Sequence, residues 1–346
     1  MKDNPSRSAL AIAASCAILL MAQMNSPAQT LLNRWSFNAP AGSLSVTDSV
    51  AGSIAELNGD ATLDGTNLNL DGSSGTYVTL SSNLLAGVEA VSCEGWADAE
   101  TSPDNVCLFS FDDGAGTGAA YARYVIHDGN NTDNQFELAD FGSTTTDPGQ
   151  QLKSPVGWGG VPVHVVCVYD PTAGIQGIYT NGILEAFRTF PVNQTTLSSV
   201  SSDAAALGRS PWWADGDPYL AGTIREFRIW NGRLDDLQIA ALDAAGPGTV
   251  STNYGAVTNL ELVVTYQMTQ HAIQQAVVFA SASALSVKPD IASLCNYTSG
   301  NTNILTVSAT GAITAVAPGS TTVTAFFGAI SNSQTVTVAQ PVAVLS

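Results

Sequence analysis

The 346-residue sequence predicts an all-β protein made of two strand-rich regions. From about residue 30 to 245, short apolar runs alternate with turns rich in Gly, Asp, Asn and Ser, which is the spacing of strands in a sandwich or barrel. Near the C-terminus, apolar and polar residues alternate one by one, as in residues 335–338, so that each strand has one buried face. Both patterns indicate sheets packed on a core.

The composition excludes several classes of protein. The chain has 11 Lys and Arg against 29 Asp and Glu, a formal charge of −18, and only 12% of its residues are charged. So few cations cannot form the basic face that a nucleic acid or an anionic membrane surface requires. Six Trp and 45% hydrophobic residues provide enough apolar material to argue against disorder. We therefore expect an acidic folded protein with no nucleic-acid partner.

Residues 1–28 have the pattern of a secretory signal peptide. Lys2 and Arg7 precede an uncharged apolar run over residues 9–22, and small residues Ser26 and Ala28 stand at the −3 and −1 positions of a cleavage site. The run is too short to cross ~30 Å of hydrocarbon as a helix. We expect cleavage before Gln29, export to the medium or the cell surface, and no membrane insertion of the mature chain.

The first region contains short apolar segments separated by explicit turn pairs such as Asp71-Gly72 and Asn181-Gly182. The candidate strands cover residues 68–70, 77–80, 91–97, 106–111, 121–127, 163–169, 177–179 and 223–230. One helix is expected over residues 234–242, because acids stand in its first turn and Gly246-Pro247-Gly248 follows it.

A polar seam separates the two regions and sets the expected domain boundaries. We expect a first domain over residues 29–246, a linker over 247–257, a second domain over 258–340 and a tail over 341–346. About eighty residues of strict β alternation fit a small sandwich of roughly seven strands.

Several motifs of the first region resemble those of laminin-G-like domains in the concanavalin-A-like jelly-roll superfamily. Residues 68–72 (LNLDG), 91–96 (VSCEGW) and 221–231 (AGTIREFRIWN) occur in the order of that family. The resemblance covers residues 31–245 and implies a jelly-roll sandwich, with Glu94 in a structural role and paired with Arg228. Arg225 departs from the pattern, since the family often has Asp there, and a calcium site using that carboxylate is in doubt here.

The second region resembles bacterial immunoglobulin-like domains of group 2. Residues 304–307 (ILTV), 311–316 (GAITAV) and 321–325 (TTVTA) match the repeat of polar and apolar residues in that family. The resemblance implies an Ig-like sandwich that acts as a spacer or stalk on an exported protein.

One loop of the first region combines aromatic and acidic residues and is the candidate ligand site. Trp212, Trp213 and Tyr219 can stack on the apolar faces of sugar rings, while Asp215 and Asp217 can accept hydrogen bonds from hydroxyls. The expected ligand is a glycan or another extracellular molecule. The alternative is that either Trp folds back and caps the sandwich.

Calcium is an open alternative for the acidic residues. Asp215 and Asp217 flank a glycine, Asp112 and Asp113 follow a strand, and the resemblance adds Asp48. Hard oxygen ligands on loops suit Ca²⁺. The other interpretation is that each carboxylate caps its own turn.

Four cysteines remain after removal of the leader: Cys93, Cys107, Cys167 and Cys295. An exported protein can form disulfides, and Cys93 with Cys107, expected on neighbouring strands, is the candidate pair. The alternative is that all four are small buried hydrophobic residues.

Catalysis has little support in the sequence. A retaining glycosidase needs two carboxyl groups ~5–5.5 Å apart, and Asp98 with Glu100 is the nearest pair that shares a strand face. His127, His164 and His271 form no nucleophile–base arrangement. We expect a non-catalytic binding or adhesion protein, with a glycoside hydrolase and a purely structural surface component as the alternatives.

Overall fold

A computed structural model describes residues 29–101, 106–116, 123–128, 136–141, 152–154, 160–191, 196–199 and 202–341. The chain divides into two compact units, one spanning Gln29–Asn253 and one beginning at Tyr254. The predicted all-β class is confirmed, because strands build both units. The predicted leader, residues 1–28, lies outside the described residues.

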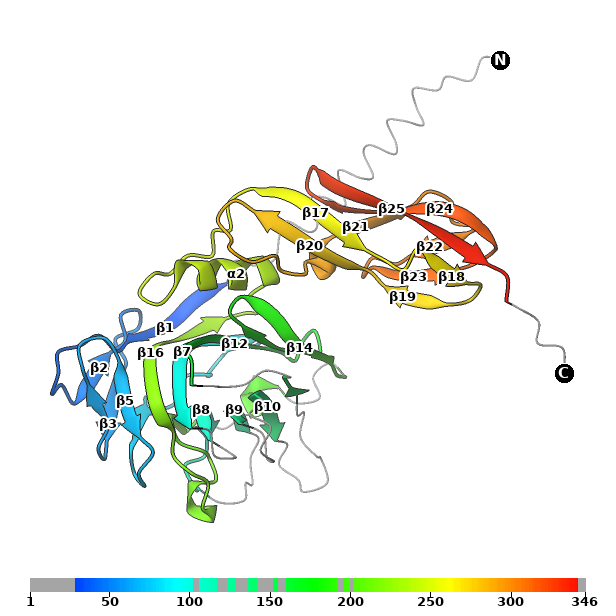
Figure 1. Ribbon diagram of the computed structural model, residues 1–346. Coiled ribbons are helices and arrows are strands. Elements are labelled where there is room, and N and C mark those ends of the chain that lie inside the picture. Colours follow the sequence, from blue (N-terminus) through cyan, green and yellow to red (C-terminus); the bar gives the residue numbers. More distant parts are fainter. Residues whose placement is uncertain are drawn as a thin grey trace, which may run out of the picture. The chain divides into compact units, whose positions relative to one another are not determined.

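The first unit is a sandwich of two antiparallel sheets, as expected for a jelly roll (Figure 1). We call the first of them sheet A. Its strands run in the order β14–β13–β12–β7–β16–β5–β4, and β1 also pairs with β16. Their bounds are β1 (Thr30–Ser36), β4 (Thr62–Leu63), β5 (Leu68–Asp71), β7 (Val91–Thr101), β12 (Val163–Asp170), β13 (Ile175–Thr180), β14 (Ile183–Thr189) and β16 (Ala221–Asn231).

The second sheet, sheet B, runs in the order β11–β10–β9–β8–β15–β6–β3–β2. Its strands are β2 (Ser45–Thr47), β3 (Ile54–Asn58), β6 (Tyr77–Leu80), β8 (Cys107–Asp112), β9 (Arg123–Asp128), β10 (Phe136–Phe141), β11 (Leu152–Lys153) and β15 (Ala204–Leu207). Alternate residues of both sheets enter a common core. There the ring of Phe227 in sheet A stacks on the ring of Trp35, with 6.2 Å between their centres, and its centre lies 5.5 Å from that of Phe109 in sheet B.

Helix α2 (Asp236–Ala245) covers the outer face of sheet A (Figure 1). Its Leu242 and Ile239 pack on Trp230 and Val166, which point away from the main core. The side chain of Asp235 accepts from the Gln238 amide at 2.8 Å, and Gln238 accepts in return from the Asp235 amide at 2.9 Å. This capping box satisfies two amides of the first turn, which is why the acids predicted the helix start.

The second unit is the smaller sandwich. Its sheets are β18–β25–β24–β21, β19–β23–β22 and the pair β17–β20. The bounds are β17 (Val257–Val263), β18 (Gln267–Thr269), β19 (Ile273–Gln275), β20 (Val277–Ala282), β21 (Asn296–Ser299), β22 (Leu305–Val307), β23 (Ala312–Ala315), β24 (Gly319–Phe327) and β25 (Ile330–Ala339). Val336 and Val338 are buried and Thr335 and Thr337 exposed, as their alternation predicted.

The predicted disulfide between Cys93 and Cys107 is wrong. Cys93 lies on β7 in sheet A and Cys107 on β8 in sheet B, and Cys93 is a free, buried thiol. The two strands are consecutive in sequence but belong to opposite sheets, so they are not neighbours. Burial raises the pKa of the Cys93 thiol well above its ordinary value, which makes it an inert core residue.

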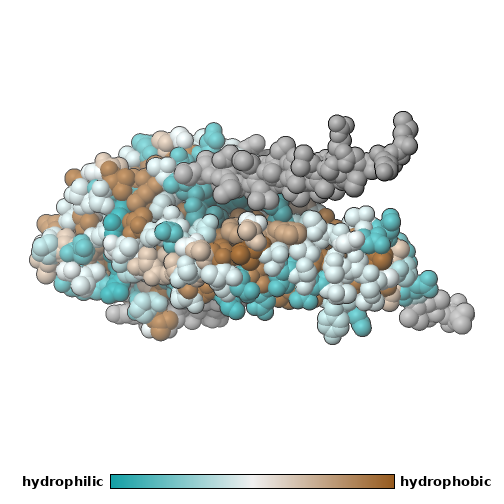
Figure 2. Space-filling view, turned by 90° about the horizontal axis from the view of Figure 1, so that it is seen from above, coloured by the Kyte–Doolittle hydropathy of each residue, from teal (hydrophilic) through white to brown (hydrophobic). Residues whose placement is uncertain are grey.

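Hydrophobic residues reach the surface only in small groups on the face drawn in Figure 2, where hydrophilic residues surround them. Single exposed apolar side chains are usual on folded proteins and need no binding partner to explain them. In the part of the chain that the structure describes, no helix is both long and apolar enough to cross a membrane.

Candidate functional site

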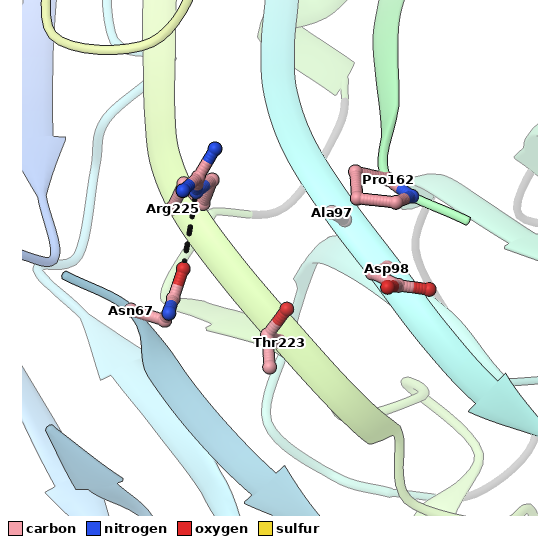
Figure 3. Close-up of a pocket in the computed structure, with 6 residues that line it drawn as sticks. All are labelled: Asn67, Ala97, Asp98, Pro162, Thr223 and Arg225. Atoms are coloured by element: carbon pink, nitrogen blue, oxygen red, sulfur yellow. Dashed lines mark hydrogen bonds between the residues drawn. The ribbon is translucent and has the colours of Figure 1, made fainter. Parts of the chain in front are cut away.

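A cavity of about 240 Å³ opens beside strands β5, β7 and β16 of sheet A (Figure 3). It is lined by Asn67, Ala97, Asp98, Pro162, Thr223 and Arg225. Asp98 and Thr223 are direct cross-strand neighbours on β7 and β16. Since Ala97 and Ala99 on either side of Asp98 belong to the core, the Asp98 side chain points to the outer face of the sheet.

Two irregularities of β16 shape this cavity. At Gly222 the register with β7 shifts, and the backbone has φ +155°, which favours glycine. A Cβ at Gly222 would overlap the carbonyl oxygen of Asp98 and lie 2.9 Å from the Ala99 Cα. The close approach of the two strands at the Asp98 backbone therefore depends on this glycine.

The second irregularity is a bulge that directs Arg225. Ile224 pairs with Ala97 and Glu226 with Trp96, so Arg225 has no partner on β7. A bulged residue is released from the sheet alternation and its side chain is redirected. Arg225 is exposed at the cavity, whereas Ile224 and Glu226 are buried.

A short chain of hydrogen bonds positions the Arg225 guanidinium. Its Nε donates to Asn67 Oδ1 at 3.2 Å, and Asn67 Nδ2 donates to Asp64 Oδ2 at 3.1 Å (Figure 3 shows the first). Hydrogen bonds from the Thr66 and Asn67 side chains and amides hold the pKa of the Asp64 carboxyl well below its usual range. This series of hydrogen bonds ends at the Asp64 carboxylate. Because a carboxylate only accepts, the Asn67 Nδ2 must face Asp64 and the Asn67 Oδ1 must face Arg225.

Asp98 contributes an unsatisfied acceptor to the cavity. Its Oδ1 is buried and accepts no hydrogen bond within the described residues. An unpaired buried acceptor costs about 1–3 kcal/mol, and a donor from a ligand would remove that cost. The sequence singled out Asp98 for a different purpose, as one half of an acid pair with Glu100, whose side chain lies outside the described part.

The aromatic loop predicted as the ligand site packs around an arginine. Trp213, in the 3₁₀-helix η2 (Trp213–Asp215), lies so close to Gly116 that a Cβ there would be 2.5 Å from its ring. The Arg209 guanidinium carbon lies 4.4 Å from the Tyr77 ring centre, and the ring centres of Tyr77 and Tyr219 are 6.1 Å apart. Trp213 is 38% exposed and Trp212 is partly buried. These contacts favour the alternative in which the aromatics cap the sandwich.

The proposed calcium ligands hold turns together. Asp48 accepts from Asn33 Nδ2 and from the amides of Arg34, Val50 and Ala51 at 2.7–3.0 Å. Asp217 accepts from the Ser210 hydroxyl.

Asp112 and Asp113 likewise accept hydrogen bonds from backbone amides two residues later. Asp215 is exposed. No group of three or more His, Cys, Asp or Glu that could hold a metal ion occurs within the described residues. The structure thus does not bring Asp48, Asp215 and Asp217 into one cation site.

A network of buried charges lies on the same face of β7 as Asp98. The prediction that Glu94 pairs with Arg228 is confirmed, because Arg228 Nη1 donates to Glu94 Oε1 at 3.0 Å. Trp230 Nε1 donates to Glu94 Oε2 at 2.8 Å, and His164 Nε2 lies 3.1 Å from Oε1. All four side chains are almost fully buried.

Two further contacts extend this network. Arg228 and Arg34 both pair with Glu226. From α2, Asp243 forms an ion pair with His164 Nδ1 at 3.3 Å, without hydrogen-bond alignment. The network therefore fastens α2 to sheet A and satisfies charges that would otherwise be costly to bury.

His164 makes the stabilisation provided by this network of buried charges dependent on pH. Burial lowers the pKa of His164, but the contacts with Asp243 and Glu94 outweigh burial and raise the pKa above its ordinary value. The charged ring thus contributes stability that is complete below pH ~6.5 and is lost as pH rises through the raised pKa.

We expect His164→Gln to destabilise the first unit more at pH 6 than at pH 9, as measured by urea unfolding. The exposed His271, changed to Gln, is the matched control and should give no such difference. A destabilisation by His164→Gln that is equal at both pH values would contradict a charged His164.

The comparisons with known families agree with both units. Residues 71–240 match the concanavalin A-like lectin/glucanases superfamily. Residues 249–338 match the group 2 bacterial Ig-like domain. The chain joins a concanavalin A-like domain to a bacterial Ig-like domain. The two resemblances predicted from the sequence are therefore confirmed, in the predicted order.

No curated protein matches the chain, but solved structures resemble it at low identity. Domain 4 of AbnA, an arabinanase from Geobacillus stearothermophilus in complex with arabinotriose, is 21% identical, with a TM-score of 0.48, and the match covers 61% of this chain and 97% of that one. The sialidase CBM40 of Ruminococcus gnavus with α2,3 sialyllactose is 17% identical, with a TM-score of 0.41 and coverages of 49% and 92%. The binding domain of Botulinum neurotoxin DC is 12% identical, with a TM-score of 0.46 and coverages of 88% and 72%.

Sequence reasoning missed most of the cavity in the concanavalin A-like domain. Asn67, Thr223 and Pro162 carry no motif that distinguishes them from other turn and strand residues. Arg225 did carry a signal, as the departure from the family pattern on an otherwise matching strand. At this position Arg225 stands where the resembling family often has Asp, next to a strand motif that otherwise matches the family.

Proposed function

We propose that this chain is an exported, non-catalytic glycan-binding protein. In this proposal the cavity beside Asp98 and Arg225 is the binding site of the concanavalin A-like domain, and the Ig-like domain serves as a spacer. The proposed export depends on the leader pattern of residues 1–28.

The observation that carries the proposal is the pairing of an unsatisfied acceptor with a positioned donor. Asp98 lines the cavity with a carboxylate whose Oδ1 accepts no hydrogen bond from the described residues, and Arg225 presents a guanidinium held through its Nε by Asn67. A sugar hydroxyl both donates and accepts hydrogen bonds, so neighbouring hydroxyls satisfy both groups. The family, which includes lectins, supports the same class of ligand.

The proposed non-catalytic role is supported by the acids among the described residues that line this cavity. Asp98 is the single carboxylate among the six lining residues, and glycoside hydrolysis by the usual route needs a pair of them.

The proposal predicts that Arg225→Ala weakens glycan binding by at least about tenfold, because a hydrogen bond to a charged group contributes about 1.5–3 kcal/mol and 1.4 kcal/mol corresponds to a factor of about ten. The measurement is binding of the full chain to a glycan array, followed by calorimetry on each glycan retained. The matched control is Arg188→Ala on β14, at the far edge of sheet A from β5, which should bind as the wild type does. A folded wild-type protein that retains no glycan would overturn the proposed function.

A further inference from the structure

The cavity of the concanavalin A-like domain holds charges of both signs on facing sides. In Figure 3, Asp98 lies on β7, and Arg225 with its partner Asn67 lies on the opposite side, with Thr223 from β16 between them. Thr223 and Asp98 are register partners, so a hydroxyl that both donates and accepts stands beside the carboxylate. Across the cavity the lining thus offers the Asp98 carboxylate as an acceptor, then the Thr223 hydroxyl, then the Arg225 guanidinium as a donor.

We propose that this site selects an uncharged sugar ring with adjacent free hydroxyls and discriminates against acidic sugars such as uronates; this rests on the proposed function. One hydroxyl donates to the Asp98 carboxylate, and its neighbour accepts from the Arg225 guanidinium. Thr223 can bond to either of them.

The electrostatics of the site argue against an acidic ligand. An arginine alone prefers a carboxylate, which it binds in bidentate geometry. Here the Asp98 carboxylate shares the cavity, so an anionic ligand that is attracted by Arg225 is also repelled by Asp98. Asp64, bonded to the far side of Asn67, adds a second negative charge behind Arg225. A neutral hydroxyl meets none of this repulsion.

The size of the cavity limits the ligand to about one ring. Its volume of about 240 Å³ is below the ~300–1,000 Å³ of pockets that take drug-sized molecules. Pro162 provides the apolar wall for the C–H face of the ring, and none of the six described residues that line the cavity is aromatic. We therefore expect recognition through hydroxyl hydrogen bonds more than through ring stacking, and modest affinity at a single site.

The test uses matched sugars that differ only at C6, where a carboxylate replaces the hydroxymethyl group. The probes are oligosaccharides of galactose and of glucose and their C6-carboxylate counterparts, galacturonate and glucuronate, measured by calorimetry with the full chain. We expect the neutral member of a pair to bind at least tenfold more tightly than its acidic counterpart. Asp98→Asn should weaken the neutral ligand about tenfold and should reduce the discrimination against the acidic one.

The control variant is Asp60→Asn, an exposed acid of the same domain, which removes one negative charge from a residue that does not line the cavity. It should change neither affinity nor discrimination. If the wild type binds glycans and both Asp98→Asn and Arg225→Ala leave the affinities unchanged, the cavity is not the binding site, and of the proposed function only glycan binding by the chain survives. Acidic sugars that bind the wild type as tightly as neutral ones would overturn the inferred specificity. A wild type that binds no glycan would overturn both.

Discussion

Replacing Glu94 with Ala is expected to destabilise the concanavalin A-like domain by about 3–5 kcal/mol, the cost of removing one partner from a buried ion pair. Glu94 is fully buried and accepts from Arg228 and Trp230, with His164 in contact. The substitution leaves the Trp230 N–H without its acceptor and Arg228 with only one carboxylate partner, Glu226. Urea or thermal unfolding, followed by Trp fluorescence, measures the loss.

Two variants show whether the loss arises from the buried charge. Glu94→Gln keeps the volume and one acceptor oxygen, so it should cost less than Glu94→Ala. Glu261→Ala removes a pair with Lys288 at 3.7 Å in which both side chains are more than half exposed, and such surface pairs contribute about 0–1 kcal/mol. If Glu94→Ala falls within the range of Glu261→Ala, the network does not hold the domain together.

The sequence motif was sufficient to predict part of this network. Glu94-Gly95-Trp96 identified the strand, and Gly95 leaves room for the other sheet, because a Cβ there would lie 3.2 Å from the Leu108 side chain, which would have to shift slightly. The contact of His164 with Asp243 could not be predicted, since it depends on where α2 docks on sheet A. The Cys93–Cys107 error has the same origin, because strand order in the sheets differs from strand order in the sequence.

The position of the proposed binding cavity could be predicted from the sequence only in part. Asp98 and Arg225 both drew attention in the sequence, one as an acid at a strand end and the other as a departure from a family pattern. What brings them to one cavity is the bulge between Ile224 and Glu226, which adds one residue to β16. A one-residue change of register moves side chains to the other face, and neither alternation nor composition reveals where it occurs.

Gly222→Ala is expected to affect both stability and binding, because this glycine allows β16 to approach β7. The methyl group would overlap the Asp98 carbonyl oxygen, and a φ of +155° is strained for alanine. Strain of this kind costs about 1–3 kcal/mol before the steric clash is added, so we expect a loss on the order of 3 kcal/mol in unfolding experiments. Glycan binding should fall by more than it does in Arg225→Ala, since moving β16 displaces Asp98, Thr223 and Arg225 together.

Gly87→Ala separates the clash from the strain. Gly87 also has a positive φ, +74°, but nothing lies within 4 Å of the position of its Cβ, so the variant should lose only about 1 kcal/mol and retain wild-type binding. A Gly222→Ala protein that matches Gly87→Ala in both measurements would mean that the two strands separate at little cost. Asp98 would then not be fixed by the close approach of β16, and the donor–acceptor pairing in the cavity would have to form when the ligand binds.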